Sequence, residues 1–375
     1  MDFAPKENLM AGSIYSLPNK ALRICLILGG FKFLCTLLAL LVFTRFTPLL
    51  DAEQYLSGAY LEHGSLRTLL VQKLVLILAK FGSDLIVHFV FGLLSLLGFF
   101  YYYLKVGTRW QLCLFLLLPS SFIWTSVIGK EAIFYGAFTL SLVIWSQFVH
   151  RRCKTLDIVI LLAAVIVCML LRPHYGLSVI WLFVSVALID KVNNKAWIWL
   201  SLLAFVSCIL FSIYVWETML YHAFYAIDPN ARASRFVYFE MDQLTGDGFE
   251  KYKALLPLGA ILGIVGPTPI EVFERPLLTP FFLEGVLILI FPAAIYVYSK
   301  TQFFLDQERF RKIFWMCLVP VIVALIVVHA PWGLLNPGSA TRWRVNFEAI
   351  FHIAPILLLY SFLDNKYDEN NSFSS

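Results

Sequence analysis

The sequence predicts an all-α fold, a polytopic transmembrane helical bundle, and two observations carry this prediction. Of the 375 residues, 60% are hydrophobic and only 14% are charged, whereas an ordinary soluble chain has roughly a quarter charged residues. The few charges also fall in short clusters between long apolar runs. This composition excludes a soluble enzyme and a disordered chain, and it predicts a single integral membrane domain over residues 1–375.

A helix needs roughly 20 mostly apolar residues to cross a hydrocarbon core about 30 Å thick, and about ten stretches meet this requirement. They lie near residues 24–44, 84–104, 110–128, 131–149, 156–172, 175–190, 196–216, 280–299, 313–330 and 347–363. Lys32 falls inside the first span, and we expect its side chain to snorkel to the inner boundary. Residues 66–80 are apolar but carry three basic residues at near-helical spacing, which is typical of a helix lying in the membrane interface. If this segment crosses the membrane instead, every later loop changes sides.

Basic clusters orient the spans, because Lys and Arg accumulate in cytoplasmic loops. With a cytoplasmic N-terminus, the later basic clusters all fall on the inner side: Lys105 and Arg109; Arg151, Arg152 and Lys154; Lys191 and Lys195; Arg309, Arg311 and Lys312. This alternation predicts that both termini are cytoplasmic. The net charge of +5 is spread over these loops and forms no basic stripe, so nucleic acid is not an expected partner.

On this topology the residues capable of chemistry gather on the outer face. Asp51 and Glu53 directly follow the first span. A carboxylate at the water–lipid boundary is able to act as a general base toward a hydroxyl group, and the alternative is a solvated loop acid.

Two further connections between predicted spans carry charged residues near the outer boundary. Lys130 and Glu131 are adjacent, and because a charge at the bilayer centre costs about 2.5–3.5 kcal/mol, we expect them to be paired or to face a wet cavity. Lys130 is alternatively a ligand for a lipid phosphate. Arg172 either snorkels or binds phosphate through its bidentate fork, and His174 taken alone is more often structural.

The long outer loop over residues 217–280 has charges of alternating sign, as a solvated surface does. Arg232 and Arg235 lie three residues apart, so on a helix both would face one anion. Residues 254–265 are too few to span and predict a re-entrant or interfacial segment. Beyond the loop, Arg342 and Arg344 flank Trp343 before the last span, where they form either an interfacial anchor or a site for pyrophosphate.

Some motifs are absent from the sequence. It contains no Gly-rich phosphate loop, no Asp-x-Asp motif of the kind that holds a metal-bound nucleotide sugar, and no His/Cys cluster with zinc spacing. Nucleotide substrates and structural metals are therefore disfavoured.

Several of these segments together resemble a family of bacterial membrane enzymes. They are an acid-plus-tyrosine motif (Asp51, Glu53, Tyr55), an interfacial helix in the first outer loop, the turn over residues 119–131, the Arg172-Pro173-His174 step, and Arg342 with Arg344. They are similar to the GT-C superfamily of polyprenyl-phosphate-sugar glycosyltransferases and to the related O-antigen and exopolysaccharide repeat-unit polymerases. The resemblance covers most of the chain in architecture.

The resemblance implies a GT-C-like, inverting glycosyltransferase of the cell inner membrane. It would move a sugar or oligosaccharide from an undecaprenyl (pyro)phosphate carrier to an acceptor glycan on the outer face, during cell-surface polysaccharide synthesis. Asp51 or Glu53 would deprotonate the acceptor. Cationic side chains would neutralise the departing phosphate, which is the main electrostatic need of such a displacement. These phosphate ligands would be Lys130, Arg172, Arg342 and Arg344, and the other substrate-binding residues would be Glu131, His174, Arg232 and Arg235.

No cofactor is expected, and a divalent cation that assists Asp51 is left open. The expected partners are the polyprenyl-linked saccharide, the lipid bilayer and other polysaccharide-assembly proteins. Two alternatives remain. The first is a repeat-unit polymerase. The second is a transporter or flippase for lipid-linked sugars, which would need charged residues at the midplane and usually an internal repeat. Only Lys32 and Glu284 interrupt the apolar spans in this way.

Overall fold

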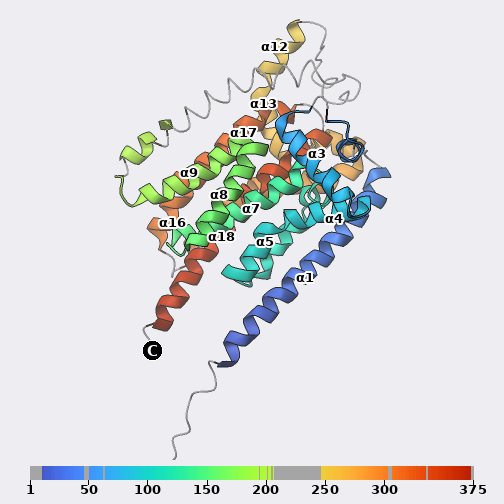
Figure 1. Cartoon of the computed structure of the whole chain (residues 1–375). Helices are drawn as coiled ribbons and strands as arrows, with labels where there is room; N and C mark the ends of the chain where they lie inside the picture. The colour runs from blue at the N-terminus through green and yellow to red at the C-terminus, as the bar shows by residue number, and fades with distance from the viewer. Residues whose placement is uncertain are drawn as a thin grey trace, which may run out of the picture. The chain divides into compact units, whose positions relative to one another are not determined.

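The computed structural model describes residues 11–45, 50–61, 64–193, 195–200, 202–203, 206, 246–302, 306–334 and 337–372. Within these ranges the chain forms helices and turns and no strands, so the predicted all-α class is confirmed (Figure 1). The chain divides into two compact units, and the single integral membrane domain stays a prediction. Unit 1 comprises residues 1–117 and 121–143, and unit 2 comprises residues 118–120 and 144–375. The boundary therefore falls inside helix α7 (Lys130–Val149).

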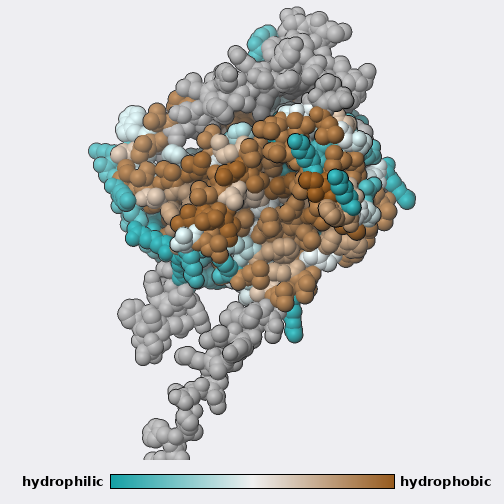
Figure 2. Space-filling model, viewed as in Figure 1, coloured by the Kyte–Doolittle hydropathy of each residue, from teal (hydrophilic) through white to brown (hydrophobic). Residues whose placement is uncertain are grey.

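Five of the described helices are long and apolar enough to cross a membrane, or six if a bent pair counts as one span. They are Lys20–Arg45, Lys130–Val149, Pro276–Thr301, Gln307–Gly333 and Thr341–Asp364, and the bent pair is Asp84–Ser95 with Leu97–Val106, at 51°. Figure 2 shows apolar side chains over much of the visible face, as a lipid-facing surface requires. These helices support the predicted transmembrane class, whereas the predicted number of about ten spans is not confirmed.

The predicted spans that are not among these helices differ from one another. Residues 156–172 and 175–190 form α8 (Thr155–Leu171) and α9 (Pro173–Ile189), apolar helices of 17 residues each, at the lower limit for crossing. Residues 110–128 do not form one helix, so that predicted span is wrong. Most of residues 196–216 lie outside the described part of the chain.

The segment 110–128 is broken at Pro119. The 3-10 helix η3 (Trp110–Leu117) precedes it, α6 (Pro119–Trp124) begins at it, and a turn leads from α6 to α7. Proline has no N–H to donate and a fixed φ, so it ends one helix and suits the first turn of the next. Sequence hydropathy does not register this break because the residues on both sides are apolar.

Unit 1 contains α1 (Ala11–Leu41), η1 (Phe43–Arg45), α2 (Leu50–Ser57), α3 (Leu66–Ala79), α4 (Asp84–Ser95), α5 (Leu97–Tyr101), the π-helical turn η2 (Tyr102–Val106) and the first part of α7. Helix α3 has 14 residues, about 21 Å of rise, which is too short to cross the hydrocarbon core. Val71, Gln72 and Val75 are buried along one side of it, whereas Arg67 and Lys73 are exposed. This distribution agrees with the predicted interfacial helix.

Unit 2 contains α8, α9 and the helices that follow residue 245. These are α12 (Gly246–Ala254), α13 (Leu256–Val265), α14 (Pro269–Glu274), η5 (Pro276–Leu278), α15 (Thr279–Thr301), α16 (Gln307–Ile313), the π-helical turn η6 (Phe314–Leu318), α17 (Val319–Gly333) and α18 (Pro337–Ser372). The described part of the predicted loop 217–280 is thus largely helical.

Helix α13, predicted as re-entrant or interfacial, packs directly along α17. A Cβ placed on Gly333 would lie 1.9 Å from the carbonyl oxygen of Gly259, and one placed on Gly259 would lie 2.3 Å from the carbonyl oxygen of Ala330. Gly259 and Gly263 form a G-x-x-x-G pattern, which lets two helix backbones approach closely inside a membrane. The glycines in residues 254–265 therefore allow α13 to pack closely on α17. Their G-x-x-x-G spacing is visible in the sequence.

Replacing Gly333 by Ala should lower the thermal stability of the chain, because the new methyl group meets backbone atoms of α13 that are unable to rotate away. Overpacking of this kind typically costs about 1–3 kcal/mol. The matched control is Gly30→Ala in α1, where no heavy atom lies within 4 Å of the added Cβ. Thermal unfolding of both detergent-solubilised variants, followed by tryptophan fluorescence, tests this. Equal melting temperatures would contradict the close packing of α13 on α17.

Helix ends at one extremity of unit 2 carry half of its basic residues. Arg309 of α16 donates from Nη2 to the carbonyl oxygen of Val149 (3.0 Å) and lies 3.4 Å from Asp190 Oδ2, so the ends of α7 and α9 meet the start of α16. Beside them the ring of His150 lies 4.7 Å from that of Phe362. Burial, with Arg309 and Arg152 nearby, lowers the pKa of His150 to about 4. We call this region, residues 149–155, 189–195 and 300–312, the basic end.

Candidate functional site

The junction of α8 and α9 places Arg172 inside unit 2. Helix α8 ends at Leu171, Pro173 begins α9, and Arg172 between them has an extended backbone (φ −152°, ψ 85°). Proline disfavours helical geometry in the residue before it and is well suited to the first turn of a helix, so the sequence Arg172-Pro173 separates the two helices. The Arg172 side chain is buried, with 4% of its surface exposed. It does not snorkel to open solvent.

Arg172 lies on a stack of two tryptophans from α17 and α18. Its guanidinium carbon is 4.1 Å from the centre of the Trp343 ring, and Trp343 stacks on Trp332 with centroids 4.3 Å apart at 8°. A cation over the face of an indole is attracted by the ring quadrupole. The buried Nε1 of Trp332 has no hydrogen-bond partner within the described ranges. Trp343 and Trp332 are both half-buried, and Trp343 supports the buried guanidinium of Arg172.

His329 of α17 lies against this stack and was not singled out from the sequence. Its Nε2 is 2.9 Å from the hydroxyl of Tyr175, and its Nδ1 is 2.7 Å from the carbonyl oxygen of Leu325. Because a carbonyl oxygen only accepts, Nδ1 carries the proton in the neutral ring and Nε2 accepts from the Tyr175 hydroxyl. His174 lies beside both, with ring centroids 4.6 Å from Tyr175 and 5.6 Å from His329. The only sequence signal for His329 is its isolation in an apolar run.

We call Arg172, His174, Tyr175, His329, Trp332 and Trp343 the stack cluster. Four helices of unit 2 contribute to it or border it, at the end of α8, the start of α9, the end of α17 and the start of α18. The start of α8 and the end of α9 lie in the basic end, so the two regions lie at opposite ends of α8 and α9. The stack cluster combines one buried cation, two aromatic planes and a hydrogen-bonded Tyr–His pair.

Arg344 lies close to this cluster in sequence but serves a different contact. It is fully buried and its Nη1 is 3.2 Å from Glu284 Oε2 and 2.5 Å from the carbonyl oxygen of Phe281, while Nη2 donates to the carbonyl oxygen of Gly266. Glu284 in turn accepts from the backbone N–H of Ser120 (3.0 Å) and from its hydroxyl (2.6 Å). Arg344 thus neutralises a buried carboxylate. Arg342 is half-buried and lies about 200° around the helix axis from Arg344.

The predicted catalytic acids lie on α2 in unit 1. Asp51 is half-buried and Glu53 is exposed, and both stand in the first turn of α2, where a carboxylate interacts favourably with the helix dipole. Gln72 of α3 accepts from the backbone N–H of Tyr60 (2.8 Å) and donates to the carbonyl oxygen of Tyr55 (2.7 Å). These bonds hold α2 and the turn after it against α3, so the acids stand on a fixed element.

Lys130 and Glu131 form the first turn of α7 in unit 1. Lys130 is half-buried and its Nζ lies 3.3 Å from the hydroxyl of Thr68 on α3, while Glu131 is 4% exposed. Lys130 therefore reaches the helix that also supports α2. That Lys130 and Glu131 are paired or face a wet cavity stays a prediction.

A polar cluster in unit 1 holds the turn between α6 and α7, and it corrects one expectation. Lys32 is fully buried: its Nζ donates to the hydroxyl of Thr125 and lies 3.5 Å from the carbonyl oxygen of Ser121. The predicted snorkelling is thus wrong, because the ammonium group finds acceptors inside the protein. In the same cluster Thr36 donates to the carbonyl oxygen of Ser126 (3.0 Å), and His88 Nδ1 accepts from the N–H of Ile128 (3.0 Å). Non-helical backbone at membrane depth needs such partners.

Two of the predicted substrate ligands, Arg232 and Arg235, lie outside the described residues. Within the described part of the chain, no three His, Cys, Asp or Glu side chains are grouped so as to hold a metal ion. The structure therefore neither places these arginines nor adds a metal site to the candidates.

Comparison with known protein families, with curated protein sequences and with solved structures finds no match to this chain. The GT-C resemblance thus stays a prediction, and the functional proposal rests on the residues and geometry described above.

Proposed function

We propose that the protein is a membrane glycosyltransferase that moves a sugar or oligosaccharide from a polyprenyl (pyro)phosphate carrier to an acceptor glycan on the extracytoplasmic face of the inner membrane. The observation that carries this proposal is the stack of the buried Arg172 on the half-buried Trp343 and Trp332. A lipid-linked sugar donor has a phosphate next to a sugar ring, and the stack offers a cation next to aromatic planes.

Stacking on Trp343 is compatible with phosphate binding by Arg172. The cation–π contact uses the flat face of the guanidinium, whereas its N–H donors lie in the plane and point outward from the edge. That edge matches two phosphate oxygens in a bidentate pair. In a buried setting such a cation stabilises the negative charge that develops on the departing phosphate.

The location of the stack cluster supports a lipid-linked donor on the outer face. The cluster lies at the extremity of unit 2 opposite the basic end, and Lys and Arg accumulate on the cytoplasmic side of membrane proteins. We therefore propose that the stack cluster faces outside, where nucleotide sugars are not available.

Asp51 is the stronger candidate for the general base, because it is half-buried while Glu53 is exposed. In the proposed reaction Asp51 accepts the proton of the acceptor hydroxyl, and the hydroxyl oxygen forms a bond to the anomeric carbon with inversion. The bond from that carbon to the phosphate oxygen breaks, and the carrier phosphate leaves with the electron pair. A cationic side chain neutralises the phosphate, and the candidates are Lys130 in unit 1 and Arg172 in unit 2.

The charged residues within the predicted spans favour an enzyme over a transporter. Lys32 is hydrogen-bonded to the α6–α7 turn, and Glu284 is paired with Arg344. Both are fully buried and engaged with protein groups. A transporter needs midplane polar groups that address the substrate.

Replacing Asp51 by Asn tests the base directly, with Glu53→Gln as the matched control on the same helix. We expect Asp51→Asn to lower transfer by about 10²–10⁴-fold, the usual contribution of a general base, and Glu53→Gln to leave it near the wild-type rate. The measurements are the length of the surface glycan and the amount of accumulated lipid-linked precursor in cells carrying each variant.

The outcomes separate the candidate activities. Loss of a single sugar from the glycan, with its precursor accumulating, supports the transferase. Loss of long chains with single repeat units retained assigns a polymerase and overturns the proposal. Unchanged glycan in Asp51→Asn excludes Asp51 as the base, and unchanged glycan in Arg172→Ala as well overturns the site.

A further inference from the structure

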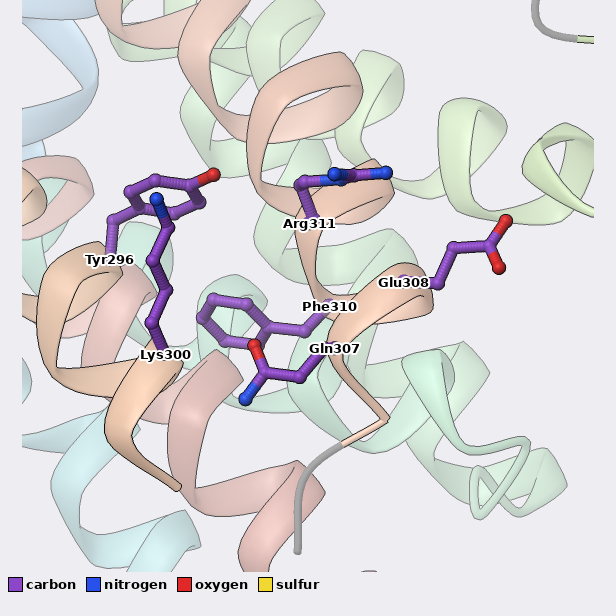
Figure 3. A pocket seen from close by; sticks show the side chains of 6 residues that line it. All are labelled: Tyr296, Lys300, Gln307, Glu308, Phe310 and Arg311. Atoms are coloured by element: carbon purple, nitrogen blue, oxygen red, sulfur yellow. The ribbon is translucent and has the colours of Figure 1, made fainter. Parts of the chain in front are cut away.

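A pocket with a volume of about 320 Å³ lies between the end of α15 and α16, in the basic end of unit 2 (Figure 3). Tyr296, Lys300, Gln307, Glu308, Phe310 and Arg311 line it. Near the start of α15, the carbonyl oxygen of Phe281 accepts a hydrogen bond from Arg344. Lys300 lies about 28 Å further along the axis of the same helix. The pocket is therefore nearly one hydrocarbon thickness away from the buried Arg344–Glu284 pair, and it belongs to neither the stack cluster nor its surroundings.

The pocket has an excess of positive charge. Lys300 places its Nζ 4.8 Å from the centre of the Tyr296 ring, and neither Lys300 nor Arg311 forms a salt bridge with any acid in the described ranges. The one acidic side chain in the lining, Glu308, is ion-paired with Lys312 at 2.8 Å. Figure 3 shows Lys300 and Tyr296 on one flank and Arg311 on the other, with Phe310 and Gln307 between them.

The other acids near the pocket are also engaged. Asp306 caps α16 by accepting from the backbone N–H of Arg309 at 3.1 Å, and Asp190 lies 3.4 Å from the Arg309 side chain. Glu308, Asp306 and Asp190 thus all have partners other than Lys300 and Arg311. An anion entering the pocket meets two positive charges.

The surface next to the pocket has the character of a membrane boundary. Trp315 and Tyr298 are half-exposed, at 50% and 51%, and Trp315 packs on Tyr296 with centroids 5.3 Å apart. Tryptophan and tyrosine concentrate at the head-group level of a bilayer. Further along α15, apolar side chains are exposed: Leu283, Leu287, Ile290 and Val297. The pocket therefore opens where a lipid-facing helix leaves the hydrocarbon core.

We propose that this pocket binds the phosphate head group of an anionic membrane phospholipid. Its volume lies at the lower limit of ligand pockets, about 300–1,000 Å³, which suits a head group and excludes a whole lipid. Basic pockets between membrane helices bind anionic head groups in this way. Lys300 and Arg311 hold the phosphate, and the acyl chains lie along the exposed apolar side of α15.

Native mass spectrometry of the full-length, detergent-solubilised protein titrated with phosphatidylglycerol tests this proposal. We expect saturable binding, and the double variant Lys300→Gln/Arg311→Gln should bind about 30-fold more weakly, which corresponds to about 2 kcal/mol for the two cations. Lys191→Gln, an exposed lysine of the basic end outside the pocket, is the matched control and should bind as the wild type does. Lys300→Arg retains the charge and should retain binding.

Three results would overturn the proposal. The first is undiminished binding by the double variant when its melting temperature is that of the wild type. The second is an equal loss in Lys191→Gln, since this would mean that overall charge and not the pocket attracts the lipid. The third is binding of soluble glycerol 3-phosphate as tightly as phosphatidylglycerol, which would assign the pocket to a soluble phosphate ester.

Discussion

Replacing Glu284 by Ala is expected to destabilise the protein more than any other single change discussed above. The substitution leaves the fully buried guanidinium of Arg344 without its carboxylate, 3.2 Å away in the native chain. Removing one partner of a buried ion pair typically costs about 3–5 kcal/mol, because the remaining charge stays out of water. Thermal unfolding of the solubilised protein, followed by tryptophan fluorescence, measures the effect.

The exposed pair Glu308–Lys312 provides the matched control. Its atoms are 2.8 Å apart, yet the Glu308 side chain is 70% exposed. Exposed pairs of this kind contribute little to stability because water and salt screen them, so Glu308→Ala should melt close to the wild type. Similar melting temperatures for Glu284→Ala and Glu308→Ala would show that the buried pair is not a stability element.

A double variant separates the cost of an unpaired charge from the net value of the pair. In Glu284→Leu/Arg344→Met both charges are removed and apolar side chains fill their space, so we expect it to be more stable than either single variant. If the two losses simply add, Glu284 and Arg344 do not interact in the way that the structure shows. The same variants also test the predicted phosphate role of Arg344. If Arg344 binds a phosphate, replacing it lowers activity whether or not Glu284 is replaced as well.

Replacing Arg172 by Ala is expected to lower sugar transfer by about 10²–10³-fold, the usual effect of removing one group that stabilises the developing charge. Arg172→Lys should recover only part of the activity, because an ammonium group keeps the charge but loses the planar stack on Trp343 and the bidentate fork. Precursor accumulation in cells and the transfer rate of the purified protein are the measurements.

Controls distinguish phosphate binding from packing. Arg275→Ala changes an exposed arginine of the same unit and should leave transfer unchanged. Trp343→Ala removes the support of the guanidinium, and we expect it to raise the KM for the lipid-linked donor more than it lowers kcat. If Arg172→Ala loses activity only in proportion to its loss of folded protein, Arg172 is structural and the proposed role fails.

The sequence predicted the location of several candidates but not their partners. Arg172 stood out because it precedes a proline between two apolar runs, and the same proline does separate α8 from α9. What lies over Arg172 was not predictable, because Trp343 is 171 residues away in sequence. His329 was missed for the same reason, since a lone histidine in an apolar run has no local pattern that distinguishes it.

Hydropathy predicted the long apolar helices but not the breaks within apolar segments or the contacts between helices. It identified every long apolar helix of the described chain, because burial in lipid depends on the composition of about 20 consecutive residues. It merged 110–128 into one span, because Pro119 breaks the helix without changing the hydropathy. It predicted residues 254–265 as a re-entrant or interfacial segment, and the structure adds that Gly259 contacts α17 at backbone distance.

The sequence alone therefore determined the all-α class and the long apolar helices, since both depend on a local property of the chain, whereas the inner or outer parity of its basic loops stays a prediction. The tertiary structure decided which charges are partners. Lys32 meets a turn near residue 125, and Arg344 meets Glu284, 60 residues away. A charge inside a membrane protein is stable only with a partner at hydrogen-bond distance, and that partner is set by packing between helices and not by sequence spacing.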